Sequence, residues 1–394
     1  MSEGAKDLHS HDTIRASGTC ASKYERVLAA FEKNFNTVSV EGYRDLGASL
    51  CVMVEGETVV DLWGGHIDRQ RSEPWKEDTM VCVFSVTKAV ASICMHMLHE
   101  RGVIDVDAPI AHYWPEFGGQ GKSGITVRQV LSHQAGLMFS DAAADGKLWC
   151  HREMTGALEA KSPEWIPGTD GGYHSFTFGP ILQEIVQRST GKTLGHFLRH
   201  EVVAPLGIEF GFGLSDEEND RCSPFFVNEM NGTINAFRHD TESSVYRCWK
   251  ALPRDESFNS ENWRKLEFAS LNGHGNARAI AKLFACLAGD GEVSGVRLLS
   301  PARVRDLSSQ HWQGMDRFSE SHARYNAGFQ LSNEVYPFGG HPGNFGFYGI
   351  GGSVGFCDPA SHLAFAYCGN NCISGASAAS SLSSTIIDTV YRLL

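Results

Sequence analysis

The sequence predicts an α/β fold with an added all-α part. One antiparallel β-sheet, flanked by helices, is built from both ends of the chain, and a helical insert domain lies between those ends. Strand-like apolar runs occur within residues 47–63 and again within residues 326–370, and the chain between them carries mainly helical patterns. A sheet made from both ends, with helices on its faces, is the simplest packing that buries all of these apolar faces.

The N-terminal part begins with a polar segment and continues with one helix and one hairpin. Residues 1–20 are polar, and we expect a flexible tail there. A helix is predicted from about Tyr24 to Phe35, because its apolar residues recur on one side. Two strand-like runs, Gly47–Val54 and Glu57–Trp63, are joined by a short polar turn and predict a β-hairpin.

The middle of the chain is predicted to be mostly helical. The clearest helix begins near Ser85, and its apolar residues recur every three or four positions from Val86 to Met97, which marks one buried face. Further helices are expected at about 125–136, 177–188, 194–203, 277–288, 301–309 and 378–393. We therefore predict an α/β domain of residues 21–80 plus 275–394 and a mostly helical domain of residues 81–274. The active site is expected at their interface.

Composition disfavours several classes of partner. The chain has 394 residues, a formal net charge of −12 and 42% hydrophobic residues. This acidic balance disfavours nucleic acids and anionic membranes, because both favour clustered Lys and Arg. No apolar run reaches the roughly 18 residues of a membrane span. The N-terminus lacks the apolar core of a secretory signal. We expect a cytoplasmic protein with a small-molecule substrate, and its composition leaves a homo-oligomer open.

The histidine pattern does not predict a metal site, and no organic cofactor is expected. His196 and His200 form an H-x-x-x-H pair that would place two imidazoles on one helix face. The pair lacks the glutamate of the zinc-binding H-E-x-x-H motif, and no third ligand accompanies it. We interpret this pair as part of a solvated helix face.

The sharpest local motif is the S-x-x-K sequence of Ser85 and Lys88 at the start of a helix. Residues three apart share a helix face, so the amine of Lys88 can reach the hydroxyl of Ser85. A serine hydroxyl needs a neighbouring base to act as a nucleophile, and a lysine whose pKa is lowered by burial can serve. The alternative is that Ser85 only caps the helix. A second S-x-x-K, Ser189 to Lys192, straddles a helix end and reads as a surface turn.

A second candidate is Tyr173, which follows Gly171-Gly172 just before a predicted helix. A tyrosine on a tight turn can project its phenol into a cleft. Near a lysine ammonium the phenolate form is favoured, and that form can act as a general base. The alternative is a core tyrosine beside a turn.

These motifs, in this order, resemble those of the serine β-lactamase and penicillin-binding-protein superfamily. The likeness is strongest to the class C β-lactamase-like esterases, or family VIII carboxylesterases, in the segments CVFSVTKAV, ITVRQVLSHQAGL, NGHGNARAIAKLF and GGSVGFCDP. It covers roughly residues 25–390. The resemblance implies a β-lactamase/transpeptidase-like fold, with Ser85, Lys88 and Tyr173 as the catalytic residues. It also implies an oxyanion hole formed by the backbone N–H groups of Ser85 and Ile350.

The chain departs from the superfamily pattern at two motifs. Ser175 stands where class C enzymes have the asparagine of Tyr-x-Asn. The third motif, Lys-Thr-Gly or His-x-Gly in the superfamily, corresponds here to Phe347-Tyr348-Gly349, so the cation that binds a β-lactam carboxylate is missing. His341, six residues earlier, would substitute if its loop folded back. The candidate substrate-binding residues are Ser175, Tyr348, Gly349, His274 and His341.

A rival motif is G-x-S-x-G around Ser353, which matches the nucleophile elbow of α/β-hydrolases. That fold requires an acid and then a histidine after the serine, and only Asp358 and His362 follow at short spacing. We therefore favour Ser85. The expected activity is hydrolysis of carboxylic esters through an acyl-enzyme. The alternatives are an amide or peptide hydrolase, a weak β-lactamase, an acyltransferase and a catalytically silent binding protein.

Overall fold

The computed structural model describes residues 13–39, 43–140, 150–227, 239–249, 258–372 and 381–394. Its centre is a nine-stranded, entirely antiparallel sheet in the order β1-β3-β2-β15-β14-β13-β12-β11-β10. Its strands are β1 (Ser17–Cys20), β2 (Gly47–Val54), β3 (Glu57–Gly65), β10 (Trp312–Met315), β11 (His322–Tyr325), β12 (Gln330–Leu331), β13 (Phe345–Tyr348), β14 (Val354–Asp358) and β15 (Leu363–Gly369). The predicted sheet from both chain ends is confirmed.

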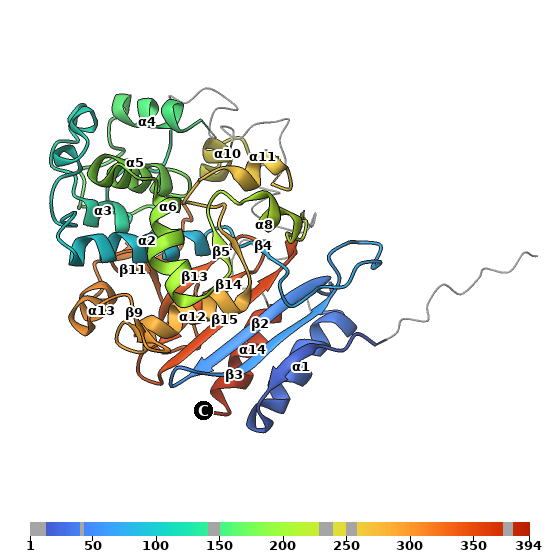
Figure 1. The fold of residues 1–394 in the computed structure, drawn as a ribbon. Coiled ribbons are helices and arrows are strands. Elements are labelled where there is room, and N and C mark those ends of the chain that lie inside the picture. Colours follow the sequence, from blue (N-terminus) through green and yellow to red (C-terminus); the bar gives the residue numbers. More distant parts are fainter. Residues whose placement is uncertain (1–12, 40–42, 141–149, 228–238, 250–257, 373–380) are drawn as a thin grey trace, which may run out of the picture.

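Helices cover both faces of the sheet and form most of the segment between its two halves (Figure 1). They are α1 (Glu25–Asn36), α2 (Val86–Glu100), α3 (Val127–Leu131), α4 (His151–Ala160), α5 (Phe178–Thr190), α6 (Leu194–Leu198), α7 (Ala204–Leu206), α8 (Asp216–Asp220), α10 (Ser244–Trp249), α11 (Glu261–Lys265), α12 (Ala277–Ala288), α13 (Pro301–Ser308) and α14 (Ser381–Tyr391). Three 3-10 turns (Ser22–Tyr24, Ile110–His112, Pro115–Gly118) and a π-helical turn (Arg199–Val203) complete them.

Smaller strand pairings lie outside the main sheet, and two of them connect the helical segment with later parts of the chain. A three-stranded sheet has the order β4 (Val81–Cys82), β7 (His274–Gly275) and β5 (Phe210–Gly211), and the remaining pairs are β6 (Phe226–Val227) with β16 (Asn371–Cys372) and β8 (Glu292–Val293) with β9 (Val296–Arg297). β4 leads directly into α2, so this small sheet lies at the start of the S-x-x-K helix.

Two sequence expectations need correction. The tail was expected to extend through residue 20, but Ser17–Cys20 form β1, which pairs with β3 along one edge of the sheet; residues 1–12 lie outside the described ranges. The helix expected over residues 125–136 is only Val127–Leu131, because His133 adopts a left-handed backbone with φ of 60°.

Alternation along the strands produces two cores. On β15, Ala364 and Ala366 face one core, which includes α2 and α12, whereas Phe365 and Tyr367 face a second core with α1 and α14. Successive side chains of a strand point to opposite faces, which accounts for this division. The first core is therefore the one that holds the S-x-x-K helix.

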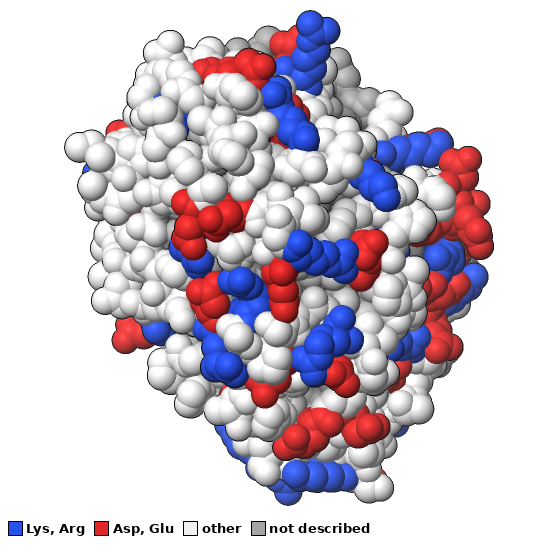
Figure 2. All heavy atoms as spheres, turned by 60° about the vertical axis from the view of Figure 1, so that its left-hand side comes forward, with Lys and Arg blue, Asp and Glu red and all other residues white. Residues whose placement is uncertain are grey.

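The surface mixes charges of both signs. On the face shown in Figure 2, Lys and Arg side chains alternate with Asp and Glu side chains, and neither sign forms a continuous block. Among the described residues, no helix is both long and apolar enough to cross a membrane.

One buried carboxyl group predicts a pH-dependent stability. Asp45 is only 2% exposed, and burial raises its pKa from 3.8 to about 6 although Tyr367 and the N–H of Leu46 donate to it. Between those values the folded state binds more protons than the unfolded state, so this contribution to stability falls as the pH rises. Above pH 6 the free energy of unfolding is therefore lower by about 3 kcal/mol than at low pH. The two pKa values differ by about two pH units, and each unit corresponds to about 1.4 kcal/mol.

Asp45→Asn should remove this dependence. We expect the Tm of the variant to gain on that of the wild type as the pH is raised from 4 to 7, as measured by thermal unfolding across that range. A difference in Tm that stays constant over this range would show that Asp45 does not titrate there.

Candidate active site

Ser85 lies where β4 meets α2. The residue before it, Phe84, has a left-handed backbone with φ of 46°, a conformation that costs energy for a side chain of this size. Ser85 occupies the N-cap position of α2, but its side chain makes no capping hydrogen bond. Its Oγ instead lies 3.3 Å from Nζ of Lys88. The structure therefore does not support the alternative in which the side chain of Ser85 only caps the helix.

Lys88 is completely buried beside this hydroxyl. Its Nζ donates to the carbonyl oxygen of Ser270 at 2.8 Å, which orients the amine towards Ser85. Burial lowers the pKa of Lys88 well below its usual value, because the charged form loses its hydration; the nearby thiol of Cys248 acts weakly in the opposite direction. The structure therefore favours an uncharged amine with a lone pair near the serine hydroxyl.

Tyr173 covers the same amine. The Nζ of Lys88 lies 4.8 Å from the centre of the Tyr173 ring. Burial raises the pKa of Tyr173, and a hydrogen bond with Ser85 only partly offsets this effect. Burial therefore acts against the phenolate form that the sequence analysis expects at Tyr173.

The loop that carries Tyr173 depends on close packing. A Cβ on Gly171 would lie 2.4 Å from the ring of Trp312, and one on Gly172 would lie 2.3 Å from Sδ of Met138. Neither glycine has a positive φ, so both are required for space rather than for backbone freedom. A larger residue at either position would push the loop, and Tyr173 with it, away from Lys88.

Two buried histidines hold the same loop, and the sequence did not single them out. His133 Nδ1 accepts a hydrogen bond from the N–H of His174 at 3.1 Å, and its ring centre lies 4.9 Å from that of Tyr173. The ring of His174 accepts from the N–H of Leu137 and contacts the carbonyl oxygen of Gly172. Burial lowers the pKa of both histidines, to about 4 for His174, so both rings are neutral at pH 7.

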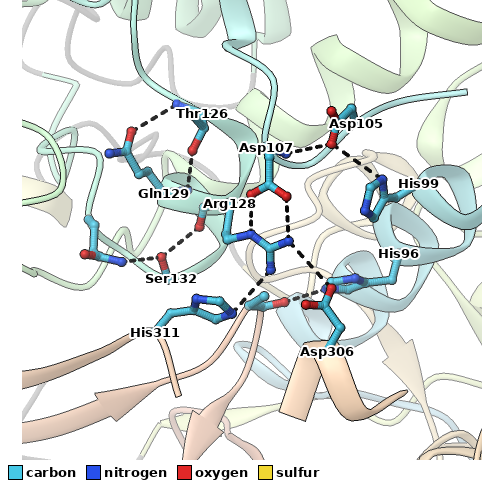
Figure 3. A network of polar contacts seen from close by, with 12 residues as sticks. His96, His99, Asp105, Asp107, Thr126, Arg128, Gln129, Ser132, Asp306 and His311 are labelled. Atoms are coloured by element: carbon cyan, nitrogen blue, oxygen red, sulfur yellow. Dashed lines mark hydrogen bonds and ion pairs between the residues drawn. The ribbon is translucent and has the colours of Figure 1, made fainter. Parts of the chain in front are cut away.

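The short helix before His133 is anchored by an ion-pair network (Figure 3). Arg128 binds both carboxylate oxygens of Asp107 and also contacts Asp306 and His311, which belong to the second half of the chain. The carbonyl oxygen of Arg128 accepts from Ser132, next to His133. The network thus fixes α3, and with it the histidine that packs on Tyr173.

The third motif lies against the residues that precede Ser85. A Cβ on Gly349 would lie 2.3 Å from the carbonyl oxygen of Val83, and Ile350 packs in one cluster with Phe84. The N–H of Gly349 donates to the carbonyl of Ser353 at 2.7 Å. Across the described ranges, the N–H groups of Ser85 and Ile350 donate to no other residue. Both are thus available to a ligand.

Some predicted site residues lie elsewhere. Tyr348 faces the second core, where its ring stacks on Phe338 at 4.9 Å and its hydroxyl donates to the carbonyl of Pro337. His341 is exposed before the start of β13, whereas Gly349 follows its end. These two substrate-binding predictions are wrong. The side chain of Tyr348 points into the second core, and His341 lies at the opposite end of β13 from Gly349.

His274 and Ser175 have different outcomes. His274 is buried in β7, with Nδ1 against the carbonyl of Asn272, and burial together with nearby Arg264 lowers its pKa to about 3. His274 pairs with Cys82 in the small sheet that leads to Ser85, and its role in substrate binding stays a prediction. Ser175 is buried beside the phenol loop, and its N–H donates to the carbonyl of Tyr173.

The rival nucleophile, Ser353, lies far from the acid and the histidine that follow it. Asp358 lies at the far end of β14 from Ser353 and binds Ser361 and Tyr391. His362 contacts the carbonyl of Ala288. Five strand residues span about 17 Å, so neither group can serve Ser353.

Comparisons with known proteins agree with this arrangement. A family model described as Beta-lactamase matches residues 29–376. Esterase/beta-lactamase LipL of Mycobacterium tuberculosis is 31% identical over 373 residues, which cover 91% of this chain and 84% of that protein. A crystal structure of a family VIII carboxylesterase superposes with a TM-score of 0.86 at 33% identity, covering 96% of this chain and 100% of that chain. A penicillin-binding protein homolog from Caulobacter crescentus has a TM-score of 0.86 at 32% identity, with the same coverage.

Proposed function

The chain belongs to the Beta-lactamase family, and we propose that it is a serine hydrolase that cleaves carboxylic esters through an acyl-enzyme on Ser85. The observation that carries this proposal is the buried amine of Lys88, which lies 3.3 Å from Oγ of Ser85. An amine whose pKa is lowered by burial can accept the hydroxyl proton at neutral pH. No metal or organic cofactor is needed for this chemistry.

The proposed reaction has two halves, which form and then hydrolyse the acyl-enzyme. As Oγ of Ser85 bonds to the ester carbonyl carbon, its proton moves to Nζ of Lys88. The N–H groups of Ser85 and Ile350 stabilise the carbonyl oxygen as it becomes negative. The C–O bond to the alcohol then breaks, and the departing oxygen takes the proton from Lys88 through the hydroxyl of Tyr173. In the second half, a water molecule passes a proton to Lys88 by the same route and attacks the acyl carbon. The bond from that carbon to Oγ then breaks, Lys88 returns the proton to Oγ, and the acid and free Ser85 are released.

Esters are favoured over β-lactams by the side chain that β13 turns towards the site. Phe347 is fully buried, and its ring centre lies 6.4 Å from that of Tyr173. A lysine or histidine at this point of the superfamily pattern would attract the carboxylate of a β-lactam, and a phenyl ring cannot. The family VIII carboxylesterase supports the same choice, whereas LipL is named as both an esterase and a β-lactamase.

Covalent labelling and substrate preference test the proposal. We expect a fluorophosphonate probe to modify Ser85, as read by peptide mass spectrometry, and p-nitrophenyl butyrate to be hydrolysed at least 100-fold faster than nitrocefin. Faster turnover of nitrocefin would replace the ester assignment with a β-lactamase. Labelling at Ser85 without ester turnover would favour amides, and the absence of labelling would favour a silent binding protein.

A further inference from the structure

The tip of the β10–β11 hairpin, residues 316–321, contacts the loop that carries Tyr173. The N–H of Arg317 donates to the carbonyl of Gly171 at 3.1 Å, and its guanidinium pairs with Asp170. The ring of Phe318 lies edge-on to that of Tyr173, with 5.8 Å between ring centres. The hairpin tip therefore packs against both the loop and the phenol ring.

One buried carboxylate organises this tip. Asp316 Oδ1 accepts from the N–H groups of Phe318 and Ser319, both at 2.9 Å, and from the Ser319 hydroxyl at 3.3 Å. Its Oδ2 accepts from the hydroxyl of Tyr325 at 3.0 Å. Burial raises the pKa of Asp316, whereas these hydrogen bonds, together with one from the backbone N–H of Tyr173, act to lower it. Every polar contact is with a donor, which suits an ionised carboxylate.

A second route from Asp316 to the phenol runs through aromatic rings. The Tyr325 ring, held by Asp316 at its hydroxyl, lies 4.6 Å from the ring of His133. His133 in turn packs on Tyr173 and binds the N–H of the following residue, His174. The two oxygens of one side chain thus hold Phe318 and Tyr325, from which separate contacts lead to the phenol.

We propose that Asp316 is a positioning residue that holds Tyr173 at Lys88 and Ser85, through Phe318 and, by a second route, through Tyr325 and His133. The inference rests on the proposed function, in which Tyr173 relays the proton. Asp316 touches no reacting atom, so its effect should appear in kcat rather than in KM.

The chain contains a control with nearly the same contacts. Asp358 is also buried, and it accepts from the N–H groups of Ala360 and Ser361 at 3.0 and 3.1 Å, from the Ser361 hydroxyl at 3.1 Å and from the Tyr391 hydroxyl at 2.9 Å. It organises the β14–β15 turn, far along the strand from the third motif. If the role of Asp316 were merely structural, variants of Asp316 and Asp358 would have the same kcat.

The test compares Asp316→Ala with Asp358→Ala in turnover of p-nitrophenyl butyrate at 25 °C, well below either Tm. Both variants should lose thermal stability. We expect kcat to fall 10- to 100-fold in Asp316→Ala, with KM within threefold, whereas Asp358→Ala keeps kcat within twofold. Asp316→Asn should recover part of the loss, because its amide oxygen can still accept from the hairpin N–H groups. Equal kcat in the two alanine variants would overturn the proposal.

A double-mutant cycle shows whether the effect passes through the phenol. In a Tyr173→Phe background, Asp316→Ala should cost less than threefold, because the hydroxyl that it positions is already gone. A full 10- to 100-fold loss in that background would overturn the proposal. If Asp316→Ala does not fold, kcat can be compared between Tyr325→Phe and Tyr391→Phe, because these tyrosines donate to Asp316 and Asp358 respectively. A wild-type protein without Ser85-dependent turnover would refute the proposed function itself, which is a separate outcome.

Discussion

Replacing Lys88 by methionine should lower kcat/KM for p-nitrophenyl butyrate by about 10⁴-fold, as should Ser85→Ala, and the double variant should lose little more. Groups that act as one unit in catalysis show this lack of additivity, because the nucleophile without its base is as inactive as the base without its nucleophile. The 3.3 Å contact and the buried position of Lys88 are the structural grounds for treating the two side chains as one unit.

The same substitution should stabilise the protein at neutral pH. Burial lowers the pKa of Lys88 in the folded state, so folding releases a proton that the unfolded chain keeps up to about pH 10. The unfolded state binds more protons over that range, so wild-type stability should rise with pH there. In Lys88→Met no charged amine has to lose its proton when the chain folds. We therefore expect a higher Tm at pH 7 together with the lost activity.

Lys122 is the matched control for this pair of measurements. It is also completely buried, and its Nζ donates to the carbonyl oxygens of Glu159 and Lys161, away from Ser85. Lys122→Met should keep kcat/KM within threefold. An Lys88→Met variant with more than a tenth of wild-type activity would show that another group takes the proton from Ser85.

How far the sequence predicts the site depends on how local each relation is. Ser85 and Lys88 are three residues apart on one helix, so a local rule places them together, and the structure agrees. Their neighbours Asp316 and His133 come from other elements. Asp316 lies in none of the segments that resemble the family, and the segment ITVRQVLSHQAGL that contains His133 assigns that histidine no role. Only tertiary packing brings the two residues to the phenol.

Errors at the third motif have a different cause. Phe347 and Tyr348 are adjacent in one strand, so exactly one of them can face the site, and which one does depends on the pairing of β13 with its neighbours. Both are large and aromatic, so no hydrophobic pattern in the sequence separates them. The effect of burial on the pKa of Tyr173 is likewise invisible in the sequence, because no local pattern reports burial.

Gly349→Val should lower kcat for ester hydrolysis by about 10²–10³-fold, the usual cost of losing one oxyanion donor. A side chain at Gly349 must displace backbone, because its Cβ would lie 2.3 Å from the carbonyl oxygen of Val83. The end of β13 would then move away from Val83 and Ser85. Ile350 is the next residue, so its N–H would leave the carbonyl oxygen of the substrate.

Gly346 distinguishes this effect from general damage to the strand. A Cβ there would lie 2.2 Å from the carbonyl oxygen of Gly355, so Gly346→Ala strains the same strand but away from Val83. We expect Gly346→Ala to lower Tm while it keeps kcat within threefold, and Gly349→Val to lower both. If instead Gly349→Val retained kcat, the second oxyanion donor would have to be sought outside Ile350. Equal losses of kcat in the two variants would indicate that β13 supports the site only as a whole strand.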